Sequence, residues 1–406
     1  MTLSTGINKS VRYKKETAGQ WGVLPGSSGG NVLRRVTSAF NLEKETYQSG
    51  EIRTDYQVQD MRHGVRSASG SLSAELSPGT YADFFAAALA KNFAAATLGA
   101  AVSTTVTVAG TVYKLIRSTG SWITDGVKVG MVVRATGLTT TADNNKNLLV
   151  AAVTATDLTV VPLNGVAMTA QGTGTSVTLT APGKVTYAPI TGHTDDSFTF
   201  EEWYSDIAQS EVFTGCKVNT ASLSIPSTGL VTADFGFMGK DLAQTGTSAY
   251  FTAPTAQSST GIFAAVNGVL MINGSPVAIV TDASININRN MQNATAVGSN
   301  SLVEMFEGRI VVDGSFSAYF QDAVMRDLFK DEVEASLVIA MTTSSAANSD
   351  FISITLPRIK VNSNTKSDGE QGIVASHDFM ALLNSAGGNG TGTEKTTIMM
   401  QDSGVA

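Results

Sequence analysis

Apolar and polar residues alternate strictly in two short stretches of the chain, "GSLSAEL" at 70–76 and "GSFSAYF" at 314–320. In the first stretch, Leu72, Ala74 and Leu76 share one side, and polar residues stand between them. A period of two residues is typical of a β-strand that buries one face. Both stretches are therefore predicted to be strands of a sheet whose other face is polar, open to water or to a channel.

The two stretches belong to a longer internal repeat. Gly70 and Gly314 have the same offset, 314 − 70 = 244 residues, as Val36 and Val280, which begin the similar segments "VTSAFNLEKE" and "VTDASININRN". The residues that follow match after a slip of one position, as a β-bulge produces. Each copy then continues into a long polar loop, which spans 46–66 in the first copy and 291–308 in the second.

A helix is predicted after each alternating stretch. In "SPGTYADFFAAALAKNF", Thr80 and Asp83 resemble a capping box. The apolar residues that follow recur at helical spacing: Phe84, Phe85, Ala88 and Leu89. The second copy has "QDAVMRDLFKDE", where Asp322 is the expected cap and the apolar stripe is Val324, Met325, Leu328 and Phe329.

A third pair of similar segments, 229–238 and 372–380, is separated by a shorter distance, so the first copy contains an insertion. The inserted residues, 97–185, form Thr/Val/Gly-rich runs with turn signals between them and no helical period. We therefore predict a mainly β fold with three parts. Copy 1 comprises 1–96 and 186–245, a small all-β domain at 97–185 lies on the outer surface, and copy 2 comprises 246–406. The Gly-rich C-terminal stretch that ends in "TTIMM" is expected to be a flexible arm, or a strand donated to a neighbouring subunit.

Composition narrows the possible functions. The 406 residues are 42% hydrophobic and only 15% charged, with a formal net charge of -7. A sequence-independent nucleic-acid binder needs a basic stripe, and the chain has none. Its single cysteine, Cys216, excludes an intrachain disulfide framework, and no run is apolar and long enough for a membrane span. The N-terminal stretch lacks the apolar region of a secretion signal, so we expect synthesis in a cytoplasm.

The sequence offers little catalytic chemistry. "GSSGG" at 26–30 matches a nucleophile elbow only formally, because its neighbours do not read as a strand and a helix. The histidines His63, His193 and His377 are far apart, and only "HTDD" at 193–196 clusters one with carboxylates, where a solvated turn is the simpler interpretation. No metal, cofactor or enzymatic activity is predicted.

These features resemble the tail tube proteins of bacteriophages with long, non-contractile tails, and look closest to those of flagellum-binding, chi-like phages. The resemblance rests on 49–89, "SGEIRTDYQVQDMRHGVRSASGSLSAELSPGTYADFFAAAL", and on its repetition at 280–332. It implies two tandem β-sandwich or barrel domains, each with one flanking helix. Subunits of such proteins join their inner sheets into rings, and the rings stack into a tube in the virion tail.

The resemblance also implies partners: further copies of the chain, the tape-measure protein, and the tail terminator and tip proteins, with double-stranded DNA passing through the tube. Assembly is expected in the host cytoplasm. Because single-domain members form rings of six, we expect three copies of this duplicated chain to form a pseudo-sixfold ring.

Two sets of residues follow as site predictions. Glu43, Glu45 and Glu75 are the candidates for a mildly acidic channel wall, along which DNA slides because it is repelled at short range. The polar loops are expected to reach the next ring and to set the stacking contact; the candidates are Asp55, Tyr56, Asp60, Arg62, Glu304 and Phe306. A tail-fibre, decoration or receptor-binding role is the alternative, since a β insertion also suits such proteins. A glycan hydrolase is a third class, but no paired carboxylates can be nominated for it.

Overall fold

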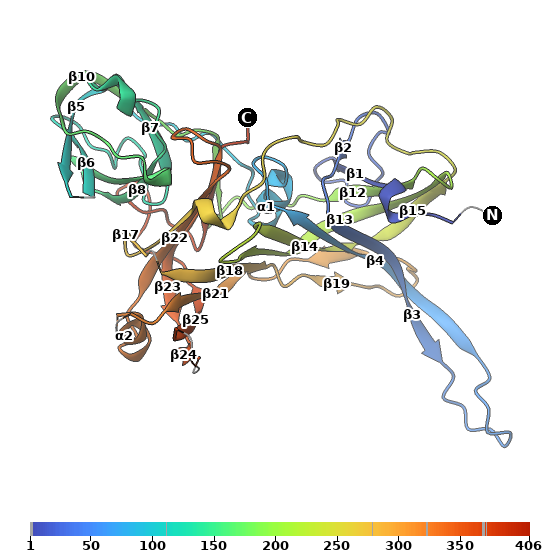
Figure 1. Ribbon diagram of the computed structural model, residues 1–406. Coiled ribbons are helices and arrows are strands. Elements are labelled where there is room, and N and C mark those ends of the chain that lie inside the picture. Colours follow the sequence, from blue (N-terminus) through green and yellow to red (C-terminus); the bar gives the residue numbers. More distant parts are fainter. Residues whose placement is uncertain (1–2, 111, 278, 322–323, 368–369, 371) are drawn as a thin grey trace.

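The computed structural model describes residues 3–406 apart from 111, 278, 322–323, 368–369 and 371. The chain is mainly β, as the alternation predicts. Figure 1 shows an elongated molecule with a small barrel at one end and a long two-stranded arm at the other.

Copy 1 is a sandwich of two antiparallel sheets. The first sheet contains β3 (Thr37–Gln48), β4 (Met61–Glu75), β14 (Thr232–Gly239) and the second half of β13 (Gln209–Ile225). The second sheet contains β2 (Asn31–Val32), β1 (Lys9–Lys15), β12 (Phe198–Tyr204), the first half of β13, and β15 (Asp241–Gly246). A short η1 (Gly6–Asn8) precedes β1.

The helix α1 (Ala82–Ala88) fills the space between these two sheets. Phe84 is fully buried, and its ring contacts Phe198 and Phe200 of one sheet and Phe235 and Phe237 of the other. The predicted apolar stripe is therefore the centre of this core, since such aromatic contacts add to simple burial.

Copy 2 repeats the two sheets, whereas its helix is less buried than α1, since Phe329 is 41% exposed. Its first sheet contains β18 (Val280–Asn288), β21 (Val311–Tyr319), β25 (Val374–Ala381) and β24 (Thr365–Lys366). Its second sheet contains β17 (Ser275–Pro276), β16 (Gly268–Ile272), β22 (Ala335–Thr342), β23 (Phe351–Val361), β26 (Met399–Asp402) and β11 (Lys184–Tyr187). The flanking elements are η4 (Ala265–Asn267), α2 (Val324–Lys330) and a small hairpin of β19 (Gln292–Ala294) and β20 (Glu304–Phe306).

The strand pairing supports the repeat in detail. Gly70 lies opposite Phe237 across β4 and β14, and Gly314 lies opposite Phe379 across β21 and β25. The pairing of β12 with β13 shifts register just after Phe198. The pairing of β22 with β23 in copy 2 shifts just after Ala335, at the equivalent position. The slip expected after Val280 is also present, as a register shift between β18 and β21.

The first sheets of the two copies join edge to edge. β13 pairs with β18 over six residue pairs, from Thr220 opposite Asn288 to Ile225 opposite Ala283. One continuous sheet therefore runs from β3 through β4, β14, β13, β18, β21 and β25 to β24.

The inserted residues form a closed barrel of β5 (Val102–Ala109), β6 (Val112–Arg117), β9 (Asp157–Pro162), β8 (Leu148–Val153), β7 (Val132–Thr136) and β10 (Gln171–Thr180), with short η2 (Thr141–Asp143) and η3 (Leu163–Gly165). The barrel has its own core, but it also shares a second one with copy 2, in which Leu149 packs with Val338 and Phe351. The insertion is thus part of copy 1 in sequence but packs against copy 2.

Two local predictions were wrong. The predicted capping box at Thr80 and Asp83 is absent, because α1 begins at Ala82 and has no side-chain cap. Thr80 bonds to Ser77, and Asp83 accepts a hydrogen bond from Tyr13. The "TTIMM" segment is not a flexible arm, because β26 pairs within the chain with both β11 and β23, and Ile398 and Met400 are fully buried. The expected cap of the second helix, Asp322, lies outside the described residues.

Candidate functional site: the polar face of the continuous sheet

The continuous sheet has one apolar and one polar face. Phe40, Leu72, Phe235, Ile285 and Phe316 are buried on the core side. On the other side, serine, threonine and asparagine side chains predominate and bond to one another across the strands. The bonds join Ser284 to Ser315 and Ser317 to Ser376, each at 2.9 Å, and Asn286 to Asp313 at 3.1 Å. We call this surface the polar face. Its strand segments are 37–43, 67–75, 220–224, 232–236, 282–288, 311–317 and 376–378.

All the charged side chains on the polar face are acidic. They are Glu43, Glu75, Asp234, Asp282, Asp313 and Asp378. The segments that form the face contain no lysine and no arginine. The carboxylates are spread over both copies, so the negative charge extends along the whole sheet. Such a surface repels a polyanion instead of binding it by counterion release.

The structure places Glu43 and Glu75 on this face. Glu43 accepts a hydrogen bond from Ser69 on the neighbouring strand, and Glu75 lies opposite Thr232. Glu45 stands at a register shift of the β3–β4 pair, beyond the face, where Tyr47 donates a hydrogen bond to it. The other four carboxylates were not predicted, although each occupies an alternating polar position of a repeated strand.

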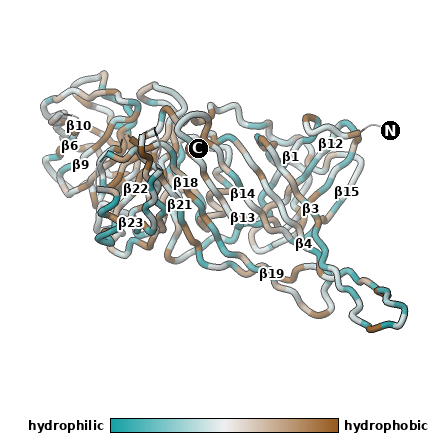
Figure 2. Tube along the Cα trace, turned by 60° about the horizontal axis from the view of Figure 1, so that its bottom comes forward, coloured by the Kyte–Doolittle hydropathy of each residue, from teal (hydrophilic) through white to brown (hydrophobic). Residues whose placement is uncertain are grey.

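The arm consists of residues 44–66, where β3 and β4 extend beyond the sandwich (Figure 1). Figure 2 shows it as a largely hydrophilic extension. Tyr56 is almost fully exposed and has a φ of 59°, in the left-handed region. Arg53 pairs with Asp55 at 2.9 Å and lowers the pKa of that carboxyl, and Asp60 pairs with Arg62 at 2.8 Å. These exposed pairs shape the tip but contribute little to stability.

Loop 291–308, the equivalent of the arm in copy 2, is not extended. It folds back over copy 1, where Met291, Leu302 and Met305 form a buried cluster against Trp21, Val65 and Met238. Its backbone also bonds to copy 1, since the Arg66 N–H donates to the Asn300 carbonyl at 2.9 Å. Glu304 and Phe306 point away from this cluster and are exposed. The two loops that the sequence makes equivalent thus differ in conformation.

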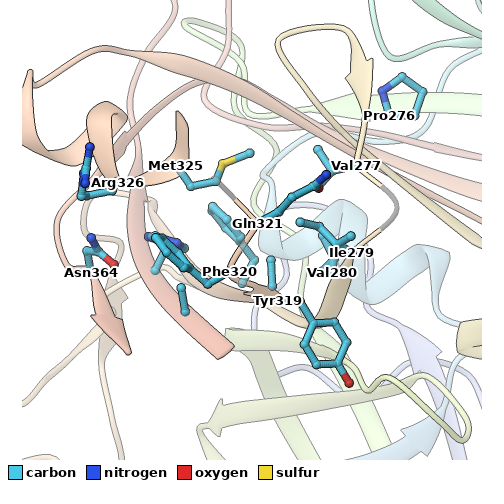
Figure 3. Close-up of a pocket in the computed structure, with 14 residues that line it drawn as sticks. Pro276, Val277, Ile279, Val280, Tyr319, Phe320, Gln321, Met325, Arg326 and Asn364 are labelled. Atoms are coloured by element: carbon cyan, nitrogen blue, oxygen red, sulfur yellow. The ribbon is translucent and has the colours of Figure 1, made fainter. Parts of the chain in front are cut away.

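A cavity of about 350 Å³ lies beneath α2, between β21, β25 and the edge residue Asn364 (Figure 3). Apolar side chains such as Phe316, Phe320 and Met325 form most of its wall. Its polar lining residues are Gln321, Arg326, Asn364 and His377. His377 is fully buried, and its Nδ1 has no hydrogen-bond partner. Burial lowers the pKa of His377, so the imidazole is neutral at neutral pH. Among the described residues, the lining contains no carboxylate and no thiol, so the neutral imidazole has no acidic or nucleophilic partner there.

The remaining reactive side chains form ion pairs or are buried in the core. Asp195 pairs with Lys217 and Asp196 with Lys15, so the carboxylates beside His193 serve ion pairs. Cys216 is buried, and burial raises the pKa of its thiol, so it packs as a small apolar residue and is not a reactive thiolate. Within the described part of the chain, no group of three or more acidic, histidine or cysteine side chains is arranged to hold a metal ion, and no helix is long and apolar enough to cross a membrane.

Comparison with known proteins agrees with this organisation. The family model described as phage tail tube protein matches residues 6–381, which include nearly all of copy 1, the insertion and most of copy 2. No curated protein matches the chain significantly. Because the match covers nearly the whole chain, the chain belongs to the phage tail tube protein family and is a structural component of the viral tail.

Proposed function

We propose that this chain is the major tail tube protein of a long, non-contractile phage tail, where it assembles into stacked rings that conduct the genome during ejection. The observation that carries the proposal is the polar face, which extends over both copies and bears six carboxylates and no cation. A tube lined by this face repels DNA at short range and lets it slide. A basic lining would hold the DNA through counterion release.

Ring formation is supported by the junction inside the chain. The pairing of β13 with β18 joins two sandwich copies edge to edge, and it leaves β3 at one end of the continuous sheet and β24 at the other. Each of these strands pairs on one edge only within the described residues. Three chains joined end to end supply six copies, the number of domains in a ring of six single-domain subunits. The ring is therefore a trimer with pseudo-sixfold symmetry, in which the contacts within and between chains differ.

Stacking of the rings is assigned to the loops. The arm projects from the sandwich (Figure 1), and Asp55 and Tyr56 lie in the segment that connects its two strands. Asp60 directly precedes the returning strand β4, and Arg62 is its second residue. Glu304 and Phe306 are exposed on loop 291–308 and face away from copy 1. These side chains contact the next ring along the tube, while the tape-measure, terminator and tip proteins set the length and the ends.

Negative-stain electron microscopy of the purified protein, combined with native mass spectrometry, tests the proposal. We expect tubes and rings, and ring masses of three chains. Isolated globules under all assembly conditions, or six chains in each ring, would contradict it. In assembled tubes, a cryo-electron microscopy map should show the carboxylates of both copies facing the channel. A continuous lysine or arginine lining would be incompatible with the proposed conduit.

A further inference from the structure

We infer that the arm of each chain docks on copy 2 of a neighbouring chain in the same ring, in the way that loop 291–308 docks on copy 1 of its own chain. This inference rests on the proposed assembly and specifies its contact surface. The occupant is a second copy of this chain, because the internal junction provides a geometric template for the contact.

The apolar part of the template is the cluster around Met238. Two methionines and a leucine of loop 291–308 bury this side chain against copy 1. In copy 2 the position of Met238 is taken by Met380, because Phe237 and Phe379 lie opposite the equivalent glycines Gly70 and Gly314. Met380 is 43% exposed, so it lacks the cover that Met238 has.

The matching cover is present on the arm. At the offset that relates Gly70 to Gly314, "DMRHG" at 60–64 aligns with "EMFEG" at 304–308. Met61 is then the equivalent of the buried Met305, and Val58 is the equivalent of the buried Leu302. Met61 and Val58 are 49% and 66% exposed on the free arm. Apolar side chains that are buried in the internal contact are thus exposed at the equivalent positions near both ends of the continuous sheet, and burying them favours association.

The ionic part of the template points to the same surface. Arg289 at the end of β18 is buried against copy 1, where it donates to the Ala87 carbonyl and pairs with Glu307, close to the Asp195–Lys217 ion pair. The equivalent of Arg289 is Lys44, which is exposed on the arm.

The ion pair itself also recurs in copy 2. The register of β22 and β23 makes Glu332 and Lys360 the equivalents of Asp195 and Lys217, and they form the same pair, 2.7 Å apart, on the surface. Glu332 is 76% exposed, so beside its pairing with Lys360 this carboxylate is accessible to the ammonium group of Lys44 from the next chain. Charge complementarity of this kind directs association to one partner surface.

The template also fixes the strand register. Ser222 of β13 lies opposite Asn286 of β18 inside the chain. The equivalents of these residues are Thr365 of β24 and Asn41 of β3, and both side chains are exposed. Asn41 of one chain is therefore expected opposite Thr365 of the next. Opposed residues of antiparallel strands have Cα atoms about 4.5–5.5 Å apart, which suits a disulfide.

The test is cross-linking in assembled tubes. Asn41→Cys combined with Thr365→Cys should give, after mild oxidation, covalent dimers and trimers on a denaturing gel, and the series should stop at the trimer because a ring closes there. The matched control is Ser222→Cys combined with Asn286→Cys, which should form a disulfide within one chain. If tubes form and the control pair oxidises while the first pair gives no product between chains, the docking inference is wrong although the proposed function stands. If the wild-type protein forms no tubes, the proposed function itself has failed.

Charge reversal gives an independent readout. Lys44→Glu is expected to reduce tube yield at least tenfold at low salt, and Glu332→Lys in the same chain is expected to restore much of it. Lys114→Glu on the barrel is the control and should assemble like the wild type. Equal yields from Lys44→Glu and the control would overturn the ionic contact, as would a double variant no better than the single one.

Discussion

Phe316 lies directly opposite His377 across β21 and β25, and the two rings stack with their centroids 5.1 Å apart. In copy 1 the equivalent pair is Leu72 opposite Phe235. Each of the two pairs thus contains one phenylalanine, which stands on β14 in copy 1 and on β21 in copy 2. The imidazole in copy 2 carries a nitrogen that the core does not satisfy.

Replacing this histidine by the residue of copy 1, His377→Phe, should therefore stabilise the protein. A buried polar atom without a partner costs about 1–3 kcal/mol, and a phenyl ring removes that cost and fills part of the adjacent cavity. Burial lowers the pKa of His377, so its contribution to stability is present above the unfolded pKa near 6.5 and is lost as the pH falls through the folded value. The gain measured by urea unfolding should be larger at pH 5 than at pH 8. His63→Phe on the exposed arm is the control, and a loss of stability at both pH values would contradict the prediction.

Shortening the arm should abolish assembly without unfolding the chain. Ser49 donates a backbone hydrogen bond to Asp60 at 2.9 Å, so residues 50–59 can be replaced by Asn-Gly while the register of β3 and β4 is kept. The removed residues are exposed and touch no core. The melting temperature should stay within a few degrees of the wild-type value, and electron microscopy should show no tubes. Normal tubes from this variant would end the assignment of stacking to the arm.

Lysines on the polar face should convert the channel into one that retains DNA. Ser71→Lys with Ser315→Lys adds one cation to each copy at polar-face positions. Assembled variant tubes are expected to bind duplex DNA at low salt, with an affinity that falls steeply as salt is added, while wild-type tubes do not. Thr107→Lys, on an exposed position of the barrel, is the control. Equal DNA binding by all three kinds of tube would show that the face does not line the channel.

Removing the insertion should destabilise copy 2, although the insertion folds as a separate barrel. Excising 97–185 exposes the apolar surface that copy 2 shares with the barrel, including Val338 and Phe351. The single variant Phe351→Ala should lower the free energy of unfolding by about 3–5 kcal/mol. It should also speed proteolysis of the connections on either side of the barrel. Val112→Ala, at an exposed site on the same barrel, should do neither.

Asp402 should make the stability of copy 2 depend on pH. Its carboxyl group accepts hydrogen bonds from the backbone of Gly79 and Gly404, each 2.8 Å long, but burial dominates and raises its pKa to about 6. The folded state therefore holds the proton more tightly than the unfolded state, so this contribution is fully present below about pH 4 and is lost as the pH rises through 6. The change amounts to about 3 kcal/mol.

The variant Asp402→Asn should flatten the dependence of the unfolding free energy between pH 4 and pH 7. Asp55→Asn at the exposed arm tip is the matched control and should leave the profile unchanged. An Asp402→Asn profile parallel to that of the wild type would show that another group controls stability in this range.

Much of the fold could be predicted because the duplication shows the same pattern twice. The period of two in 70–76 and 314–320 places Glu75 on the polar face without any knowledge of tertiary structure. Glu45 lies beyond the polar face because a register shift beside it breaks the alternation, and the sequence does not mark that position.

The remaining errors concern contacts between segments far apart in the chain. β26 follows a Gly-rich stretch that is typical of a flexible tail, and only its position between β11 and β23 makes it a core strand. The anchoring of the barrel depends on small apolar residues such as Ala151 and Ala340, which carry no periodic signal. Thr80 is a good helix cap by residue type, but the hydroxyl of Ser77 competes for it.

The discontinuity of copy 1 has a consequence for the order in which the chain folds on the ribosome. β4 ends at Glu75, but its partner β14 begins only at Thr232, so the nascent first sheet waits with an open edge while the insertion is made. The barrel strands between 102 and 180 pair only among themselves, so their pairing does not depend on any segment that is synthesised later. We expect the barrel to be native before either sandwich closes. During synthesis it would separate the unfinished edges of neighbouring chains on one messenger RNA, at the stage when unpaired strands are most prone to aggregate.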